Sequence, residues 1–130
     1  TLIAVVVAVC LVGGGVLAWT LHLDTERAKV DISVKHDAAC PAGRPLSVSL
    51  HNKAEVPLER TLFSLHARKP GYSSVVTPYT FKQYESDKII PPGGSFSACY
   101  PLPPMSRDRE SEADSALLEW SATVDTVYFQ

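Results

Sequence analysis

Apolar and polar residues alternate at every second position along most of the chain after residue 29. A period of two is the pattern of β-strands with one buried face, because successive side chains of a strand point to opposite sides. Three such strands are expected at about residues 30–35, 46–51 and 60–68. Their expected buried positions are Val30, Ile32, Val34, Leu46, Val48, Leu50, Phe63, Leu65 and Ala67.

The second half of the chain predicts further short strands separated by turns. Residues 75–84 are rich in β-forming side chains but contain Pro78, so we expect an edge strand or two short pieces there. Residues 91–94 read Pro-Pro-Gly-Gly, in which proline fixes φ and glycine accepts a positive φ. Two more strands follow, and the residues expected on their apolar faces are Phe96, Ala98, Tyr100, Leu118, Trp120, Ala122 and Val124.

The number and spacing of these strands indicate the fold class. About seven short strands in roughly 100 residues, with no amphipathic helix of useful length, predict an antiparallel, immunoglobulin-like β-sandwich. A small β-barrel is the alternative architecture. The expected β domain covers residues 30–130.

The first 23 residues follow a different pattern, because they contain no acidic or basic side chain. At about 1.5 Å per residue, the apolar run is long enough to cross a hydrocarbon core of about 30 Å. A signal peptide cleaved near Val16-Leu17-Ala18 is the competing interpretation. We therefore expect a single N-terminal transmembrane α-helix at residues 1–23, in contact with the lipid bilayer, and a short stalk at residues 24–29 before the β domain.

Small side chains follow one face of this expected helix at alternating spacings of four and three residues. Stripes of this kind let two helices approach closely in a bilayer, where hydrophobicity does not drive association. The alternative is that Ala and Gly are simply frequent in transmembrane helices. The candidate helix-packing residues are Ala4, Ala8, Leu11, Gly14, Gly15 and Ala18.

Two of the three cysteines, Cys40 and Cys99, lie in the expected β domain. We expect them to form a disulfide, which would close a loop of about 60 residues and stabilise the fold by about 4 kcal/mol. Cys10 lies in the apolar run, where we interpret it as a small packing residue. Because disulfides persist in oxidising compartments such as the periplasm, we expect the C-terminal domain to lie outside the cytoplasm. The single Asn, Asn52, suits a bacterial genome rich in G and C, so the expected location is the bacterial inner membrane, single-pass, with the C-terminal domain in the periplasm.

Charge and motifs give no sign of chemistry. The 12 Lys and Arg are balanced by 14 Asp and Glu, a net charge of -2 that does not favour nucleic-acid binding. The chain has no G-x-S-x-G, S-x-x-K or H-E-x-x-H motif, so no catalytic residue and no cofactor are expected. It also has no C-x-x-C motif, and a disulfide would remove both thiolates from coordination, so no metal site is expected either.

The stretches FSLHARKPGYSS at residues 63–74 and DKIIPPGGSFSACY at residues 87–100 carry a resemblance. They resemble a family of short, poorly characterised bacterial single-pass membrane proteins with an extracytoplasmic β domain. Some members are labelled multidrug transporters. However, one helix without an intramembrane charge cannot form an alternating-access pathway, so the resemblance implies at most an accompanying role beside a transporter.

One turn carries the residue types that are enriched at protein interfaces, namely Arg68, Lys69 and Tyr72 around a Pro-Gly pair. A solvated loop is the alternative. The leading functional hypothesis is a non-catalytic accessory or structural subunit of a larger inner-membrane complex, with integral membrane subunits as partners and the β domain capping the periplasmic side. The alternatives are an anchored periplasmic copper carrier or assembly factor, and an envelope ligand-binding module associated with a transporter.

Overall fold

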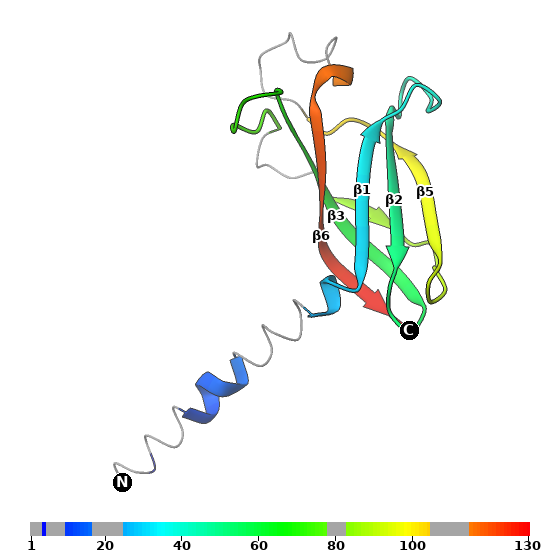
Figure 1. Ribbon diagram of the computed structural model, residues 1–130. Helices are drawn as coiled ribbons and strands as arrows, with labels where there is room; N and C mark the ends of the chain where they lie inside the picture. The colour runs from blue at the N-terminus through cyan, green and yellow to red at the C-terminus, as the bar shows by residue number, and fades with distance from the viewer. Residues whose placement is uncertain (1–3, 5–9, 17–24, 78–82, 105–114) are drawn as a thin grey trace.

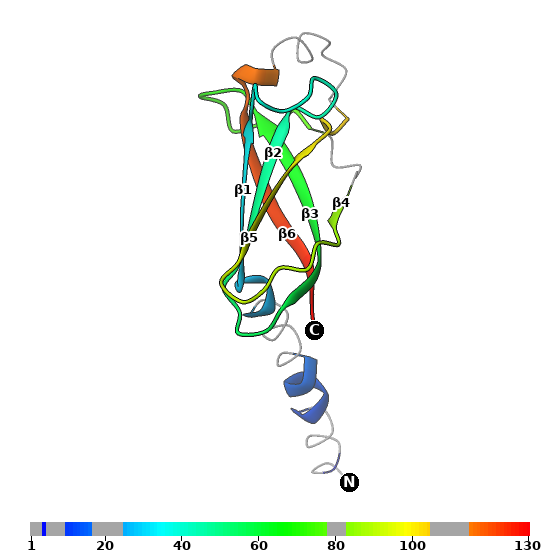
Figure 2. The same ribbon diagram turned by 90° about the vertical axis from the view of Figure 1, so that its right-hand side faces the viewer.

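The computed structural model describes residues 4, 10–16, 25–77, 83–104 and 115–130. These residues form two small β-sheets that lie face to face (Figure 1, Figure 2). The described elements are β1 (Val30–His36), β2 (Leu46–Asn52), β3 (Leu58–Arg68), β4 (Tyr84–Ser86), β5 (Ser95–Tyr100), the short 3-10 helix η2 (Ser115–Leu117) and β6 (Glu119–Phe129).

Each sheet has three antiparallel strands in its described part. The first sheet, sheet A, has the order β1-β2-β5, and the second, sheet B, has the order β4-β3-β6. The strands β2 and β3 are therefore central. Along one side of the domain β1 and β6 are in contact across the two sheets (Figure 1).

The core lies between the sheets and is centred on β2 and β3. Side chains at alternate positions of both strands are at most 3% exposed, as the period-two pattern predicts. The inward-facing apolar side chains of β1, β5 and β6 are more exposed, because edge strands have a neighbour on one side only. The buried members of the two core clusters are Val30, Leu46, Val48, Leu50, Leu58, Phe63, Leu65, Tyr84 and Ile90.

Three aromatic rings fill one half of this core. Phe63 stacks on Tyr84 with ring centroids 5.6 Å apart, and Tyr100 meets both rings edge-on at 5.3 and 5.9 Å. The Tyr84 hydroxyl donates a hydrogen bond of 2.8 Å to the Pro101 carbonyl. Burial raises the pKa of Tyr84 from 10.0 to about 12, because the phenolate would lose its hydration.

The raised pKa of Tyr84 predicts a loss of stability at alkaline pH. A folded-state pKa above the unfolded value means that the stability is fully present below pH 10 and is lost as the pH rises towards 12. We expect the free energy of unfolding to fall by roughly 1–2 kcal/mol over this window, less than the full shift implies because the hydroxyl is only part-buried. Urea unfolding at a series of alkaline pH values measures it.

The matched controls for this measurement are Tyr84→Phe and Tyr72→Phe. The first should lose about 1 kcal/mol at neutral pH, with its hydrogen bond, and show a shallower alkaline decline. Part of the decline should remain, because burial also raises the pKa of Tyr100, helped by the charge of Asp87 and opposed by a hydrogen bond with Ser86. Tyr72 is exposed, so its variant should decline like the unmodified chain. Equal declines in both variants would contradict the assignment to Tyr84.

The pairing of β3 with β6 is irregular at two places, between Leu58 and Arg60 and between Leu62 and Phe63. The second irregularity is a bulge in β6. The register passes from Leu62↔Thr126 to Phe63↔Val124, so Asp125 has no direct partner and forms a bulge. The bulge explains why Val124 and Val127, three residues apart, both pack against the core. The Asp125 carboxylate accepts hydrogen bonds from Ser64 Oγ and, at 3.3 Å, from Gln83 Nε2.

Asn52, at the end of β2, is a fully buried polar residue. Its Nδ2 donates to the carbonyls of Val56 and Ile90 at 2.9 and 3.0 Å. Its Oδ1 accepts a hydrogen bond of 2.9 Å from the backbone N–H of Ala54. The side chain thus joins the end of β2, the turn before β3 and the segment before β5.

The turn at residues 91–94 agrees with its sequence prediction. The N–H of Gly94 donates to the carbonyl of Pro91 at 2.9 Å, and Gly93 has φ 73°, so Pro92 and Gly93 occupy the central positions of a type II turn. The turn also pairs with β2, since Asn52 exchanges backbone hydrogen bonds with Gly93 and Gly94. The chain therefore enters β5 in a fixed register.

The structure contradicts the prediction of an N-terminal transmembrane helix. None of the helical stretches in the described residues combines the length and the apolar character that crossing a membrane requires. The predictions of a transmembrane helix at residues 1–23, of single-pass anchoring in the bacterial inner membrane and of a periplasmic location are therefore wrong.

The strand prediction also needs correction. Instead of about seven strands, the described residues contain six, three in each sheet. In the region expected to form an edge strand, Val75 makes an isolated bridge to Arg68, and β4 begins only at Tyr84. Pro78 and its neighbours up to residue 82 lie outside the described residues.

Candidate functional site

The loop after β3 carries the residues that the sequence singles out as a partner surface. Both views show it standing away from the sheets, at the end of the domain opposite to Gln130 (Figure 1, Figure 2). The N–H of Tyr72 donates to the carbonyl of Lys69 at 3.0 Å, and Gly71 has φ 84°, which makes a second type II Pro-Gly turn. We call residues 69–76 the tip loop.

The base of the tip loop is fixed to β3. Arg68 and Val75 form an antiparallel bridge, and the N–H of Val76 donates to the carbonyl of Ala67 at 2.8 Å. The hydroxyl of Thr77, which is buried, accepts from the N–H of Ala67 at 3.4 Å. The loop is therefore held in one conformation at its base and presents its tip to solvent.

Two of the three predicted surface residues meet at a hollow in this loop. The hollow has a volume of about 270 Å³ and is lined by Lys69, Tyr72, Ser74 and Val76. Tyr72 is 68% exposed. The third predicted residue, Arg68, does not line it, because its Nε pairs with Glu119 Oε2 at 3.2 Å on sheet B.

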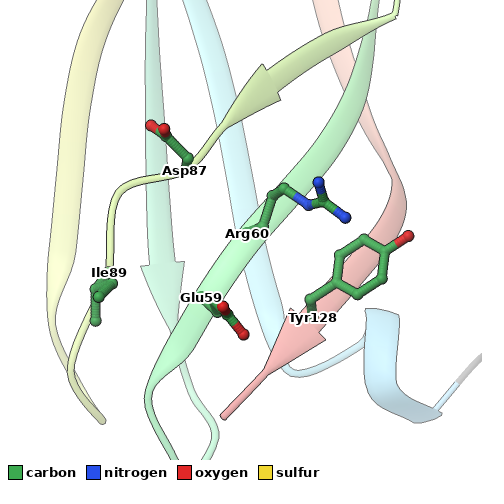
Figure 3. A pocket seen from close by; sticks show the side chains of 5 residues that line it. All are labelled: Glu59, Arg60, Asp87, Ile89 and Tyr128. Atoms are coloured by element: carbon green, nitrogen blue, oxygen red, sulfur yellow. The ribbon is translucent and has the colours of Figure 1, made fainter.

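A second hollow lies at the opposite end of β3, on the outer face of sheet B (Figure 3). Its volume is about 370 Å³. The guanidinium of Arg60 lies 4.3 Å from the centre of the Tyr128 ring and 3.5 Å from Glu85 Oε1. The residues that line this hollow are Glu59, Arg60, Asp87, Ile89 and Tyr128, and we call it the sheet B hollow.

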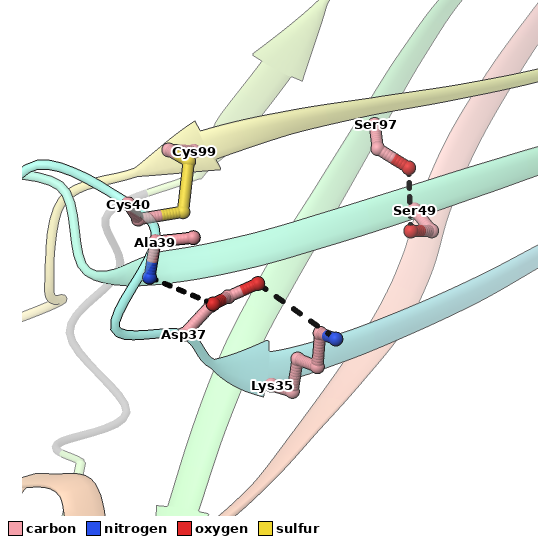
Figure 4. Close-up of a disulfide and its surroundings, with 7 residues drawn as sticks. All are labelled: Lys35, Asp37, Ala39, Cys40, Ser49, Ser97 and Cys99. Atoms are coloured by element: carbon pink, nitrogen blue, oxygen red, sulfur yellow. Dashed lines mark hydrogen bonds and ion pairs between the residues drawn. A yellow bond between two sulfur atoms is a disulfide. The ribbon is translucent and has the colours of Figure 1, made fainter.

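The outer face of sheet A is covered mainly by serines. Ser33, Ser49 and Ser97 lie side by side across the three strands, and the hydroxyls of Ser49 and Ser97 share a hydrogen bond of 2.7 Å (Figure 4). Because their side chains are short and carry hydroxyl groups, the serines make this face flat and polar. Neither hollow described above lies on it.

A neighbouring row on this face places Asp31, His51 and Ser95 side by side. These are the residue types of a hydrolase triad, in which the two imidazole nitrogens contact the acid and the serine separately. Here His51 Nδ1 hydrogen-bonds to Ser95 Oγ at 2.8 Å, whereas Asp31 Oδ1 pairs with Lys53 Nζ at 2.9 Å. The acid is therefore engaged elsewhere, and the row lacks the geometry of an activated nucleophile.

Cys40 and Cys99 form a disulfide with a Cα–Cα distance of 5.9 Å, the pairing that the sequence predicts (Figure 4). The loop after β1 presents Cys40 to β5, and Asp37 organises that loop. The carboxylate of Asp37 accepts from the N–H of Ala39 at 2.9 Å, and its carbonyl accepts from the N–H of Cys40 at 3.1 Å. The two sulfurs are thus bonded to each other. Within the described residues, no group of three or more His, Cys, Asp or Glu is arranged to hold a metal ion.

The predicted helix-packing residues are only partly covered by the structure. Ala8 and Ala18 lie outside the described residues. Ala4 is exposed, and so is Leu11. A Cβ added at Gly14 or Gly15 would meet nothing within 4 Å. Their packing role stays a prediction, and Cys10 is exposed and not disulfide-bonded.

The sheet B hollow is the feature that the sequence prediction missed. Its residues come from the start of β3, the segment after β4 and the end of β6. Leu58 and Thr61 are both buried although they lie three residues apart, and the irregularity between Leu58 and Arg60 puts Glu59 and Arg60 both beside the hollow. This irregularity depends on the pairing with β6, so the sequence of β3 alone does not reveal it.

Comparison with known proteins gives no relative: no family model, no curated protein and no solved structure matches the chain.

Proposed function

We propose that this domain is a non-catalytic interaction module that serves as an accessory part of a larger protein assembly and docks on its partner through the tip loop. The observation that carries the proposal is the hollow lined by Lys69, Tyr72, Ser74 and Val76 around an exposed tyrosine. Tyrosine combines a large apolar ring with a hydroxyl and few rotatable bonds, so it loses little entropy on binding. Such residues are enriched among those that dominate binding energy.

The anchoring of the loop supports the same proposal. Hydrogen bonds at Tyr72, Val76 and Thr77 fix the loop before any partner arrives. A preorganised loop loses less conformational entropy on association, so more of the contact energy contributes to affinity. The loop also stands clear of both sheets, so the two sheets do not obstruct a partner that approaches it (Figure 2).

The test is to isolate the full chain from the cells that make it, under mild conditions, and to compare it with the Lys69→Ala/Tyr72→Ala variant. We expect the unmodified chain to co-purify with one partner in fixed stoichiometry. Loss of a central tyrosine typically costs 2 kcal/mol or more, so the variant should bind that partner at least about 30-fold more weakly. Binding of the purified partner, measured by calorimetry, gives the affinities.

The matched control is Val56→Ala, which removes an exposed apolar side chain from the turn before β3. It should bind like the unmodified chain. Both variants change exposed positions, so their thermal unfolding should stay close to that of the unmodified chain. A chain that purifies as a lone monomer, or a double variant with undiminished affinity, would contradict the proposal.

A further inference from the structure

We infer that the sheet B hollow is a separate docking site for a protein segment that presents a basic side chain next to an aliphatic one. The hollow and the tip loop lie at opposite ends of β3. Arg60 and Arg68 mark the two ends; they are eight positions apart along the strand, a distance of roughly 26 Å. The inference does not depend on what the tip loop binds.

Arg60 is the one cation among the described residues that line the hollow, and it is already engaged. Arg60 points toward the Tyr128 ring in Figure 3, and its guanidinium is also within 3.5 Å of Glu85. These two contacts hold the guanidinium against the ring and offset its charge. Arg60 therefore forms a wall of the hollow and does not supply a free charge for an anion.

Acidic groups are in excess among the described residues that line the hollow. Glu59 and Asp87 line the hollow, and neither forms an ion pair with a residue in the described part of the chain. With Glu85 engaged by Arg60, these two carboxylates leave the lining with a net negative charge. Charge complementarity therefore favours a cationic side chain on the partner. It disfavours phosphate-rich ligands such as nucleic acid.

Apolar surface lies beside these charges in the hollow. Ile89 is 53% exposed and Tyr128 is 40% exposed, and both line the hollow. A volume of about 370 Å³ lies near the small end of the range for ligand pockets, about 300–1,000 Å³. It suits one or two side chains, with the cation at the carboxylates and an aliphatic neighbour against Ile89.

The experiment titrates the full, isotope-labelled chain with two synthetic peptides and follows its backbone amides by NMR. The probes are acetyl-Lys-Leu-Arg-Leu-Lys-amide and its acidic counterpart acetyl-Glu-Leu-Glu-Leu-Glu-amide. We expect saturable shifts with the basic peptide, centred on Glu59, Asp87 and Tyr128, that weaken as salt is added. The acidic peptide should cause none there.

Two variants and one control locate the binding. Glu59→Gln and Asp87→Asn should each weaken the basic peptide about threefold to fivefold, because each removes one partly screened charge pair. Asp31→Asn removes a carboxylate from the outer face of sheet A and should leave the affinity unchanged. All three positions are exposed, so the variants should fold like the unmodified chain.

The inference is overturned if the basic peptide causes no shift at millimolar concentration, or if both peptides bind equally. It is also overturned if the shifts centre on the tip loop, or if Asp31→Asn weakens binding as much as the other two variants. None of these results would bear on the affinity of the Lys69→Ala/Tyr72→Ala variant for its partner, so the two proposals fail separately.

Discussion

Replacing Asn52 by alanine is expected to lower the free energy of unfolding by about 3 kcal/mol, a large share of the stability of a small domain. The substitution leaves the carbonyls of Val56 and Ile90 and the N–H of Ala54 without their side-chain partner. Two of these three hydrogen bonds are buried, so water cannot replace them without opening the structure. Urea unfolding at neutral pH measures the loss.

Two further variants show whether the hydrogen bonds of Asn52 are responsible. His51→Ala changes the adjacent residue, which faces outward and bonds to Ser95, and should cost at most about 1 kcal/mol. Asn52→Asp keeps the shape but directs a carboxylate at two carbonyls, so it should be at least as destabilising as alanine at neutral pH. Its pKa should be raised in the folded state, so stability should recover as the pH falls from that raised pKa towards the ordinary value for aspartate, about 3.9, below which no further gain is expected. An alanine variant as stable as the His51 variant would contradict this role.

Removing the disulfide is expected to lower the free energy of unfolding by about 4 kcal/mol. The bond joins residues 59 apart in the sequence, so cutting it gives the unfolded chain much more conformational freedom. It also fixes the loop after β1 to Cys99 of β5, which pairs with Ser47 in sheet A. The comparison is between the chain and its Cys40→Ser/Cys99→Ser variant in urea unfolding, with Cys10→Ser in both, since Cys10 is exposed and would exchange with the others.

Reductant provides the control for this comparison. It should destabilise the disulfide-bonded protein by a similar amount and leave the Cys40→Ser/Cys99→Ser variant unchanged. If reductant lowers the free energy of unfolding by less than about 1 kcal/mol, the bond does not constrain the unfolded chain as the entropy model requires. Equal unfolding slopes in urea would show that both proteins expose the same surface.

Alternation alone was sufficient to place most of the sheet core. Leu46, Val48 and Leu50 are buried as their spacing requires, and so are Phe63 and Leu65. The Pro-Gly turns were readable for the same local reason, since few residues other than glycine accept the positive φ of Gly71 and Gly93. Local chemistry determines these features, so a single sequence is enough to predict them.

The features that the sequence analysis did not predict depend on contacts between distant residues. The bulge at Asp125 moves Val127 to the core side, and its effect depends on pairing with β3, about 60 residues earlier. The sheet B hollow depends on three separated segments, none of which carries a distinctive motif. The transmembrane helix was predicted from the length and composition of the apolar run alone, whereas no helix among the described residues is long and apolar enough to cross a membrane.

The partner surface was predicted in part. Lys69 and Tyr72 meet at the tip-loop hollow, because the Pro-Gly turn brings them to the same side of one short loop. Arg68 does not join them, because it is the last residue of β3 and its side chain pairs with Glu119 across the sheet. Residues that are adjacent in the sequence can therefore point in different directions at the end of a strand, because the side-chain alternation of the strand stops where the turn begins.

The first strand and the last strand meet at the same end of the domain. Val30 and Phe129 belong to one cluster of core residues, so the chain enters and leaves within a short distance, and the tip loop lies at the far end (Figure 1). A domain of this topology can be inserted into a surface loop of an unrelated host protein without separating the two cut ends of the host. The tip loop would then point away from the host, which makes the fold a natural scaffold for displaying a short recognition loop at a distance.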